Sequence, residues 1–239
     1  MTSLLDYLDG RPDADRHRLA MIEWRYLLVL ESRQRPAKVL HQELARDPEL
    51  FADVIAMVFR PEQDDQEQDV TEDERHRAIL GYQLLQSWRT VPGAPGSSGT
   101  PDGPDLAQWV TDARALLTQR GLLRPGDRFI GQILSQTPQD PDGTWPGRLV
   151  RDIIEAARSQ DIEQGIDMAI LNGRGVTWRD MDTGGQHERA LADKYQGYAQ
   201  RTRTQWPRTR RMLQRMAENW DRRARQEDQL AATREDFWS

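Results

Sequence analysis

The longest stretch of helical periodicity in the chain runs from Gln186 to Leu230, and Trp206-Pro207 interrupts it. The residue before a proline avoids the α region, whereas proline itself suits the first turn of a helix, so we expect two helices here. Each has one face at helical spacing. The faces consist of Leu191, Tyr195, Tyr198, Ala199 and Thr202 before the break, and of Leu213, Met216, Ala217, Trp220 and Ala224 after it. The sequence therefore predicts a helical hairpin whose two faces pack against each other or a common core.

This hairpin is also the one strongly basic part of the sequence. Residues 186–227 contain eleven Lys or Arg and five Asp or Glu, a net charge of +6, whereas the whole chain has a net charge of -6. Four arginines of the second helix project from one side, and we call them the arginine stripe: Arg208, Arg211, Arg215 and Arg222. Like charges at this spacing repel by about 0.2–0.5 kcal/mol per pair, so we expect acidic groups nearby. They could be Glu218 and Asp221, an acidic protein partner or a nucleic-acid backbone.

Most of the remaining chain shows helical periodicity as well. Asp13 or Asp15 is expected to cap a helix that runs through Glu31, is apolar on most sides and is therefore central. Residues 36–59 read as a helical hairpin with a break at Asp47-Pro48, and Thr71 with Glu74 forms a capping box. Further helices are expected after Asp105, around 129–134 after Pro125-Gly126-Asp127, around 149–157, and over 162–171 after a cap at Ser159 or Asp161.

No convincing strand pattern occurs, so about ten helices in successive hairpins predict an all-α fold. Such a succession is compatible with HEAT-like or armadillo-like stacking, although no fixed repeat length is visible. Residues 90–104 are rich in Gly, Pro and Ser and read as a flexible loop or linker. This predicts an N-terminal helical subdomain over 1–89 and a C-terminal one over 105–239, with the helices on either side packed together across the loop.

Composition narrows the class of protein. The absence of cysteine excludes disulfides and thiolate catalysis and fits a cytoplasmic protein. No apolar run reaches the roughly 18 residues that a membrane span needs, so no membrane partner is expected. Only Lys38 and Lys194 are lysines among 33 basic residues, a bias typical of GC-rich bacterial genomes.

No motif in the sequence supports catalysis or a cofactor. The four histidines are too scattered for a metal site, and Asp140-Pro141-Asp142-Gly143 is better explained as a turn before a helix than as a calcium loop. The glycines of the loop over 172–187 fit no phosphate-binding fingerprint, so a ligand role there is the less favoured interpretation. We therefore expect no catalytic residue, no metal and no cofactor. An enzyme whose site lies in the 172–187 loop is the third hypothesis, after the two binding functions described below.

Several stretches together resemble a known group of proteins. They are IEWRYLLVLESRQRPAKVLHQELARDPELFADVIAMVFRP, SWRTVPG, DPDGTWPGRLVRDIIE, NGRGVTWR and ALADKYQGYA. They are similar to the helical C-terminal region of large, uncharacterised bacterial proteins. The resemblance implies a helical module that works as part of something larger, and it carries over no site residue.

Two functions follow from the charge distribution. The leading hypothesis is a non-enzymatic interaction module of a bacterial multidomain protein or complex, with an acidic protein partner on the basic hairpin. The alternative is a nucleic-acid-binding module in which the arginines contact phosphates and Trp206 stacks on a base. Both use the same candidate binding residues: Arg201, Arg203, Trp206, Arg208, Arg211, Arg215 and Arg222.

The sequence also contains acidic residues that could neutralise the positive charge of the hairpin within the same chain. Eight acids lie between Glu62 and Glu74, an acidic stretch that reads as an exposed loop. We expect this acidic loop to dock on the basic hairpin and to mask its arginines until a partner displaces it.

Overall fold

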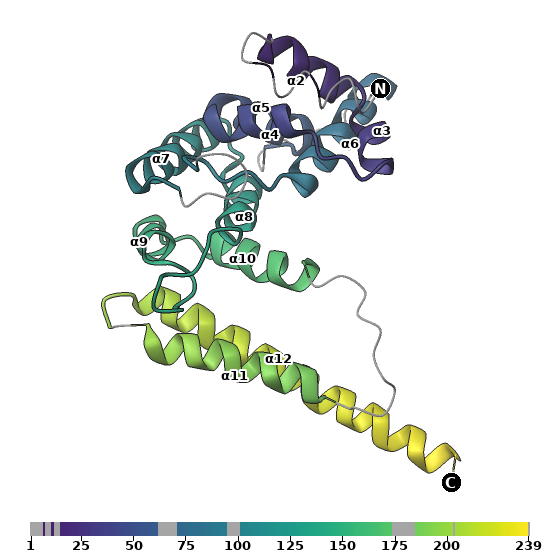
Figure 1. Ribbon diagram of the computed structural model, residues 1–239, viewed down its shortest axis with the longest axis vertical. Coiled ribbons are helices and arrows are strands. Elements are labelled where there is room, and N and C mark those ends of the chain that lie inside the picture. Colours follow the sequence, from purple (N-terminus) through teal and green to yellow (C-terminus); the bar gives the residue numbers. More distant parts are fainter. Residues whose placement is uncertain are drawn as a thin grey trace. The chain divides into compact units, whose positions relative to one another are not determined.

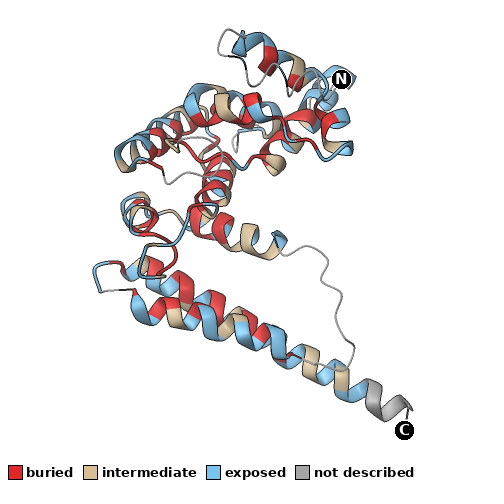
Figure 2. Cartoon of the chain, viewed as in Figure 1, coloured by how far each residue is buried: buried red, intermediate tan, exposed pale blue. Residues whose placement is uncertain are grey.

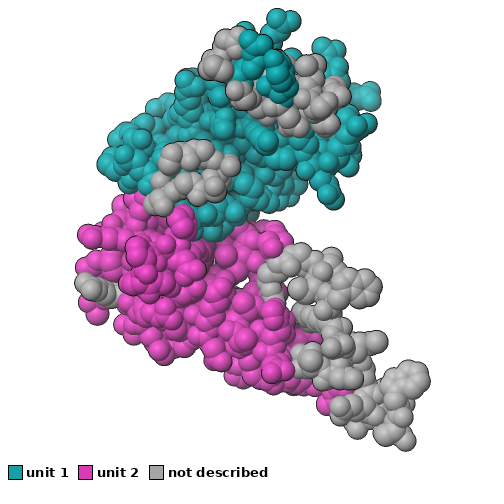
Figure 3. Space-filling model, in the orientation of Figure 1, with its two compact units in different colours: residues 1–137 teal, residues 138–239 magenta. Residues whose placement is uncertain are grey.

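The structure is a computed structural model that describes residues 7, 11, 15–61, 71–94, 101–173, 185–202 and 204–238, with side-chain surroundings described as far as 233. These residues form eleven helices and no strand, which confirms the all-α prediction (Figure 1). Among the described residues, none of the helices combines the length and apolar content needed to cross a membrane. The chain divides into two compact units, residues 1–137 and 138–239 (Figure 3).

The first unit contains seven helices within its described residues. They are α2 (Arg16–Arg25), α3 (Leu27–Ser32), α4 (Lys38–Arg46), α5 (Pro48–Val58), α6 (Glu72–Ser87), α7 (Gly103–Gln119) and α8 (Leu123–Leu134). The boundary between the units therefore lies well beyond the predicted 90–104 linker, and α7 and α8 belong with the N-terminal helices.

Helix α5 forms the centre of the first unit, because it packs against α4, α6, α7 and α8. Phe51, Ala52 and Ile55 of α5 are completely buried. Figure 2 shows buried residues along α5. The helix expected to be central is instead split at Tyr26 into α2 and α3, and it leaves Met21, Leu28 and Val29 exposed. The prediction of a central helix was therefore wrong. Apolar residues are common on protein surfaces, so apolar residues on most sides of a helix do not imply that other helices pack against all of them.

Local capping signals set several helix boundaries correctly. Asp15 caps α2, Asp47 caps α5 with Pro48 in its first turn, and Thr71 and Glu74 form both hydrogen bonds of the capping box at α6. Two starts differ from the prediction. Helix α7 begins after Asp102 rather than Asp105, and α8 begins at Leu123, so that Pro125, Gly126 and Asp127 lie inside it.

The helices on either side of the Gly/Pro/Ser-rich segment pack together, as predicted. Trp88, at the end of α6, lies 5.7 Å from Trp109 of α7 between ring centroids, and Phe51 lies 5.5 Å and 5.1 Å from these two rings. The two ends of the segment are buried at Thr90, Val91 and Pro101. Its middle, residues 95–100, lies outside the described residues.

The second unit contains α9 (Arg148–Ala157), α10 (Gln160–Asn172), α11 (Gln186–Arg201) and α12 (Pro207–Trp238) among its described residues. The last two form the predicted hairpin, with the break at Trp206-Pro207, and pack along much of their length (Figure 1). The expected faces are buried at Tyr195, Tyr198 and Ala199 of α11, and Leu213, Met216, Ala217, Trp220 and Ala224 of α12 are buried as well. Residues 174–184 lie outside the described residues, which includes most of the glycine-bearing 172–187 loop.

Candidate functional site

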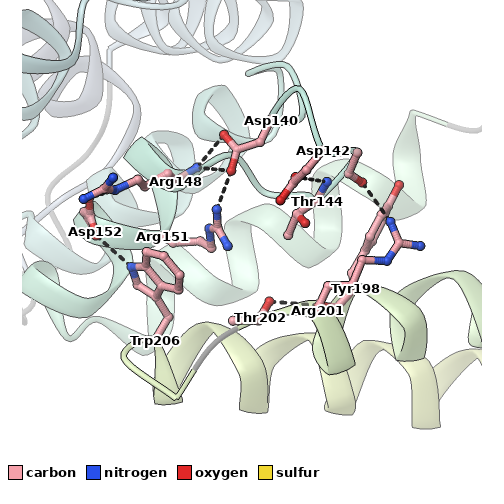
Figure 4. Close-up of polar contacts among 11 residues, drawn as sticks. Asp140, Asp142, Thr144, Arg148, Arg151, Asp152, Tyr198, Arg201, Thr202 and Trp206 are labelled. Atoms are coloured by element: carbon pink, nitrogen blue, oxygen red, sulfur yellow. Dashed lines mark hydrogen bonds and ion pairs between the residues drawn. The ribbon is translucent and has the colours of Figure 1, made fainter.

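The candidate site is the basic hairpin. Trp206 lies directly before α12 and contacts α9. The Trp206 side chain is only 5% exposed, its indole Nε1–H donates to Asp152 Oδ1 at 2.7 Å, and the Arg151 guanidinium lies 4.0 Å from its ring centroid (Figure 4). Asp152 and Arg151 belong to α9. Trp206 therefore fastens the start of α12 to α9, and no open ring face remains for a nucleic-acid base.

Helix α9 is held at its own start by Asp140. The backbone N–H of Arg148 donates to Asp140 Oδ1 at 2.9 Å, and the buried Arg151 side chain donates to the same carboxylate (Figure 4). An anionic group at a helix N-terminus is stabilised by the helix dipole and by the unpaired N–H groups there. Asp140 thereby links the beginning of α9 to the guanidinium that covers Trp206.

The Asp140-Pro141-Asp142-Gly143 segment is the turn that the sequence predicted. Gly143 N–H donates to Asp140 O at 2.8 Å, and Gly143 has a φ of +76°, which favours glycine. The Thr144 backbone N–H donates to Asp142 Oδ1 at 2.8 Å, and this hydrogen bond lowers the pKa of the Asp142 carboxyl. Both aspartates thus serve the turn and the helix that follows it.

A second carboxylate of α9 caps α12 across the packing interface. The backbone N–H of Thr209 donates to Glu155 Oε1 at 2.9 Å, and its hydroxyl donates to the same oxygen at 3.1 Å. Thr209 is completely buried. Glu155 therefore satisfies a donor in the first turn of α12 that has no partner within its own helix.

The arginine stripe meets its acidic partner at Glu163 of α10. The Arg208 guanidinium donates to Glu163 Oε1 at 2.7 Å and 3.1 Å, and the Arg215 guanidinium donates to Glu163 Oε2. Glu163 is 5% exposed, whereas Arg208 and Arg215 are 26% and 53% exposed. One carboxylate thus relieves repulsion between two arginines and leaves a net positive charge. The predicted acidic group exists, but it is neither Glu218 nor Asp221, and Asp221 pairs with Arg225 instead.

The other two arginines of the stripe remain available. Arg211 and Arg222 are exposed, and none of the ion pairs among the described residues involves them. The Arg222 side chain donates only to the neutral side chain of Asn219. Arg210, which is exposed on another side of α12, likewise has no acidic partner in the described part of the chain.

The two remaining candidate residues lie at the end of the hairpin near its turn. Arg201 is exposed, donates to the carbonyl oxygen of Gly143 at 3.3 Å and lies 5.7 Å from the Tyr198 ring centroid (Figure 4). Arg203 lies outside the described residues. Residues 62–70 of the acidic loop also lie outside the described residues. The docking of this loop on the hairpin therefore stays a prediction.

A cavity of about 330 Å³ lies between α10 and α12 beside the available arginines. Arg215 and Arg222 line it from α12, and Glu163 and Asp167 line it from α10, with the buried Met212 and Met216 below. Burial raises the pKa of Asp167, while the charges of Arg223 and Arg215 act in the opposite direction. Positive charge, a partly buried carboxyl and apolar side chains therefore lie together along this side of α12.

The described residues contain no group of three or more His, Asp or Glu side chains placed to hold a metal ion. Comparison with protein-family models, with curated protein sequences and with solved structures finds no match.

Proposed function

We propose that the chain is a non-enzymatic α-helical interaction module of a cytoplasmic, bacterial multidomain protein or complex. Its contact surface is the side of α12 that carries Arg211, Arg215 and Arg222, together with the cavity beside α10. The partner is an acidic protein surface. The observation that carries the proposal is that the four arginines of the stripe differ in their partners. Glu163 pairs with Arg208 and Arg215, whereas Arg211 and Arg222 are exposed and pair with no carboxylate among the described residues.

Physical reasoning favours a protein partner over a nucleic acid. Phosphate binding gains most from several adjacent cations that are free to release counterions. Here Arg208 and Arg215 already share Glu163, and Asp167 and Glu218 lie on the same surface. The Trp206 ring, which the nucleic-acid hypothesis assigned to base stacking, is covered by Arg151. A mixed surface of separated arginines, carboxylates and methionines suits the polar rim and apolar centre of a protein interface.

The test uses a photo-crosslinking amino acid in place of Glu218, which is exposed and next to the stripe. Crosslinking in the bacterium that encodes the chain should give a protein adduct that the second-site change R211Q/R222Q removes. The matched control R33Q/R75Q alters two exposed arginines of the first unit and should leave the adduct in place. Adducts that contain only nucleic acid, or an adduct that R211Q/R222Q leaves unchanged, would contradict the proposal.

A further inference from the structure

A groove runs between α10 and α12 of the second unit. It consists of the cavity of about 330 Å³ described above and a second cavity of about 240 Å³. The two are continuous, because both are lined by Asp167 of α10 and by Asn219 and Arg222 of α12. The α10 side extends from Gln160 to Leu171, about 16 Å along the helix axis. The groove therefore has room for several residues of a partner.

The dimensions of the groove favour an extended polypeptide over a helix. One turn of a helix with its side chains is about 10–12 Å wide and occupies about 400–600 Å³, which exceeds the volume of either cavity. An extended chain is narrower and advances about 3.3 Å per residue. About five extended residues would therefore span the α10 side of the groove.

Polar side chains along both walls can hydrogen-bond an extended chain. Such a chain presents N–H and C=O groups to either side, and each needs a partner when it is buried. Three exposed amides line the groove and form no hydrogen bond with another described residue: Gln160 and Gln164 of α10 and Gln226 of α12. An amide side chain can both donate and accept. The buried Met212, Met216 and Trp220 give the groove an apolar base.

Asp167 is an acceptor without a donor at the point that the two cavities share. Its side chain is partly buried and forms no hydrogen bond or ion pair with another described residue. Arg215 and Arg223 act on its carboxyl through their charges alone. A carboxylate that has lost part of its hydration is stabilised by hydrogen bonds from N–H groups. Asp167 is therefore suited to accept a hydrogen bond from the backbone of a docked chain.

Arg222 and Arg223 supply positive charge to the second cavity. Both are exposed, and neither pairs with a carboxylate among the described residues. The Arg223 guanidinium lies 5.1 Å from the Trp220 ring centroid. This cavity is the more positive of the two, because Glu163 and Glu218 line only the first. Two neighbouring guanidinium groups can bind a carboxylate through charge-assisted hydrogen bonds.

We propose that the groove binds an extended acidic segment of the protein partner. A carboxylate of the segment lies between Arg222 and Arg223, and a backbone N–H of the segment donates to Asp167. Charge complementarity selects this occupant, because the two arginines lack a carboxylate of their own whereas Glu163 is already paired. The inference rests on the proposed function, and it adds the conformation of the contacting segment and the part that α10 plays in binding it.

Fluorescence anisotropy of fluorescein-labelled hexa-L-glutamate tests this proposal with the purified 239-residue chain. At physiological ionic strength we expect saturable binding with a Kd below about 1 mM. Hexa-D-glutamate has the same charge, but it should bind at least about tenfold more weakly because its stereochemistry does not match the walls of the groove. Equal binding of the two enantiomers, or tighter binding of a labelled hexamer of deoxythymidylate, would indicate a general attraction for anions and overturn the proposal.

Variants locate the binding of hexa-L-glutamate. R222Q/R223Q should weaken it at least about tenfold, because both guanidinium groups that hold the carboxylate are lost. The matched control R210Q/R225Q removes the same charge from two other exposed positions of α12 and should change the affinity by less than about twofold. Circular dichroism checks that each variant is folded. Equal affinities of R222Q/R223Q and R210Q/R225Q would overturn the proposal.

D167A separates hydrogen bonding from simple charge attraction. The change removes a negative charge and an acceptor together, so attraction of an acidic peptide by charge alone predicts tighter binding. We expect the opposite, a loss of about threefold to tenfold, because the backbone N–H of the peptide loses its acceptor. A D167A protein that binds hexa-L-glutamate more tightly than the wild type would overturn the proposal.

These results can be distinguished from failure of the proposed function. An in-cell protein adduct at position 218 that R211Q/R222Q removes, together with no binding of hexa-L-glutamate, would overturn the extended acidic segment and leave the interaction module standing. Absence of an adduct that depends on Arg211 and Arg222 would overturn the proposed function and this inference with it.

Discussion

The Glu163 carboxylate of α10 accepts from the Arg208 guanidinium of α12 at 2.7 Å, although the two residues are 45 positions apart in the chain. The same carboxylate also accepts from Arg215. This pairing divides the arginine stripe into Arg208 and Arg215, which share one carboxylate, and Arg211 and Arg222, which pair with no carboxylate among the described residues. The division gives each arginine a different expected response to substitution.

The first prediction concerns Glu163 itself. E163Q keeps the shape of the side chain but leaves two guanidinium groups without their shared anion. Because both arginines are partly solvated, we expect a loss on the order of 2 kcal/mol in the free energy of unfolding, measured by urea denaturation. E218Q, an exposed change on the same side of α12, should stay within about 0.5 kcal/mol of the wild type. Equal stability of the two variants would show that the Glu163 pairing contributes nothing.

Two glycines give a matched pair of packing tests. A Cβ atom at Gly126 of α8 would lie 2.3 Å from Leu117 Cδ1, whereas one at Gly197 of α11 would meet nothing closer than Arg201 Nη2 at 3.8 Å. We expect G126A to lower the free energy of unfolding by about 1–3 kcal/mol through overpacking. G197A should raise it by roughly 0.5–1 kcal/mol because alanine favours the helix. Thermal denaturation of both variants measures this difference, and a stabilising G126A would mean that Leu117 moves aside freely.

His41 makes the stability of the first unit depend on pH. Burial, with a smaller contribution from the charge of Arg89, lowers the pKa of His41 to about 4. In the unfolded chain the ring titrates near its ordinary pKa of about 6.5, so between these values only the unfolded state gains the proton. Stability should therefore fall as the pH falls from about 6.5 to 4, by about 3 kcal/mol at most.

The comparison is between the wild type and H41Q, by urea denaturation across this pH range. The glutamine variant cannot take up the proton, so its stability should fall less steeply, whatever its stability at neutral pH. Parallel curves for the two proteins would contradict a neutral, buried His41.

Local signals in the sequence predicted the fold well. The capping box at Thr71 and Glu74, the Asp47-Pro48 break and the Trp206-Pro207 break all depend on neighbours within a few residues, and the structure confirms them. The start of α8 was placed too late because Pro125 and Gly126 usually mark a turn. Gly126 is tolerated inside the helix, where it packs closely against Leu117. The HEAT-like or armadillo-like arrangement stays a prediction.

The sequence predicted less of the candidate site than of the fold. The hairpin and its exposed arginines follow from periodicity and charge, but Asp152, Glu155 and Glu163 looked like ordinary polar positions of α9 and α10. They gain their roles from contacts to residues 45 to 54 positions away, and no local pattern encodes such contacts. No local pattern encodes the contacts that join α7 to the N-terminal helices either, because the rings of Phe51, Trp88 and Trp109 that make them lie far apart in the sequence.

The central claim is that Arg208 supports the fold whereas Arg211 and Arg222 contact a partner. Stability and partner capture should therefore be measured together for R208Q and for R211Q/R222Q, each carrying the photo-crosslinker at position 218. We predict that R208Q lowers the free energy of unfolding by about 1–2 kcal/mol, and that R211Q/R222Q leaves it within about 0.5 kcal/mol but abolishes the protein adduct. An R211Q/R222Q protein that retains the adduct, or that loses as much stability as R208Q, would contradict the claim.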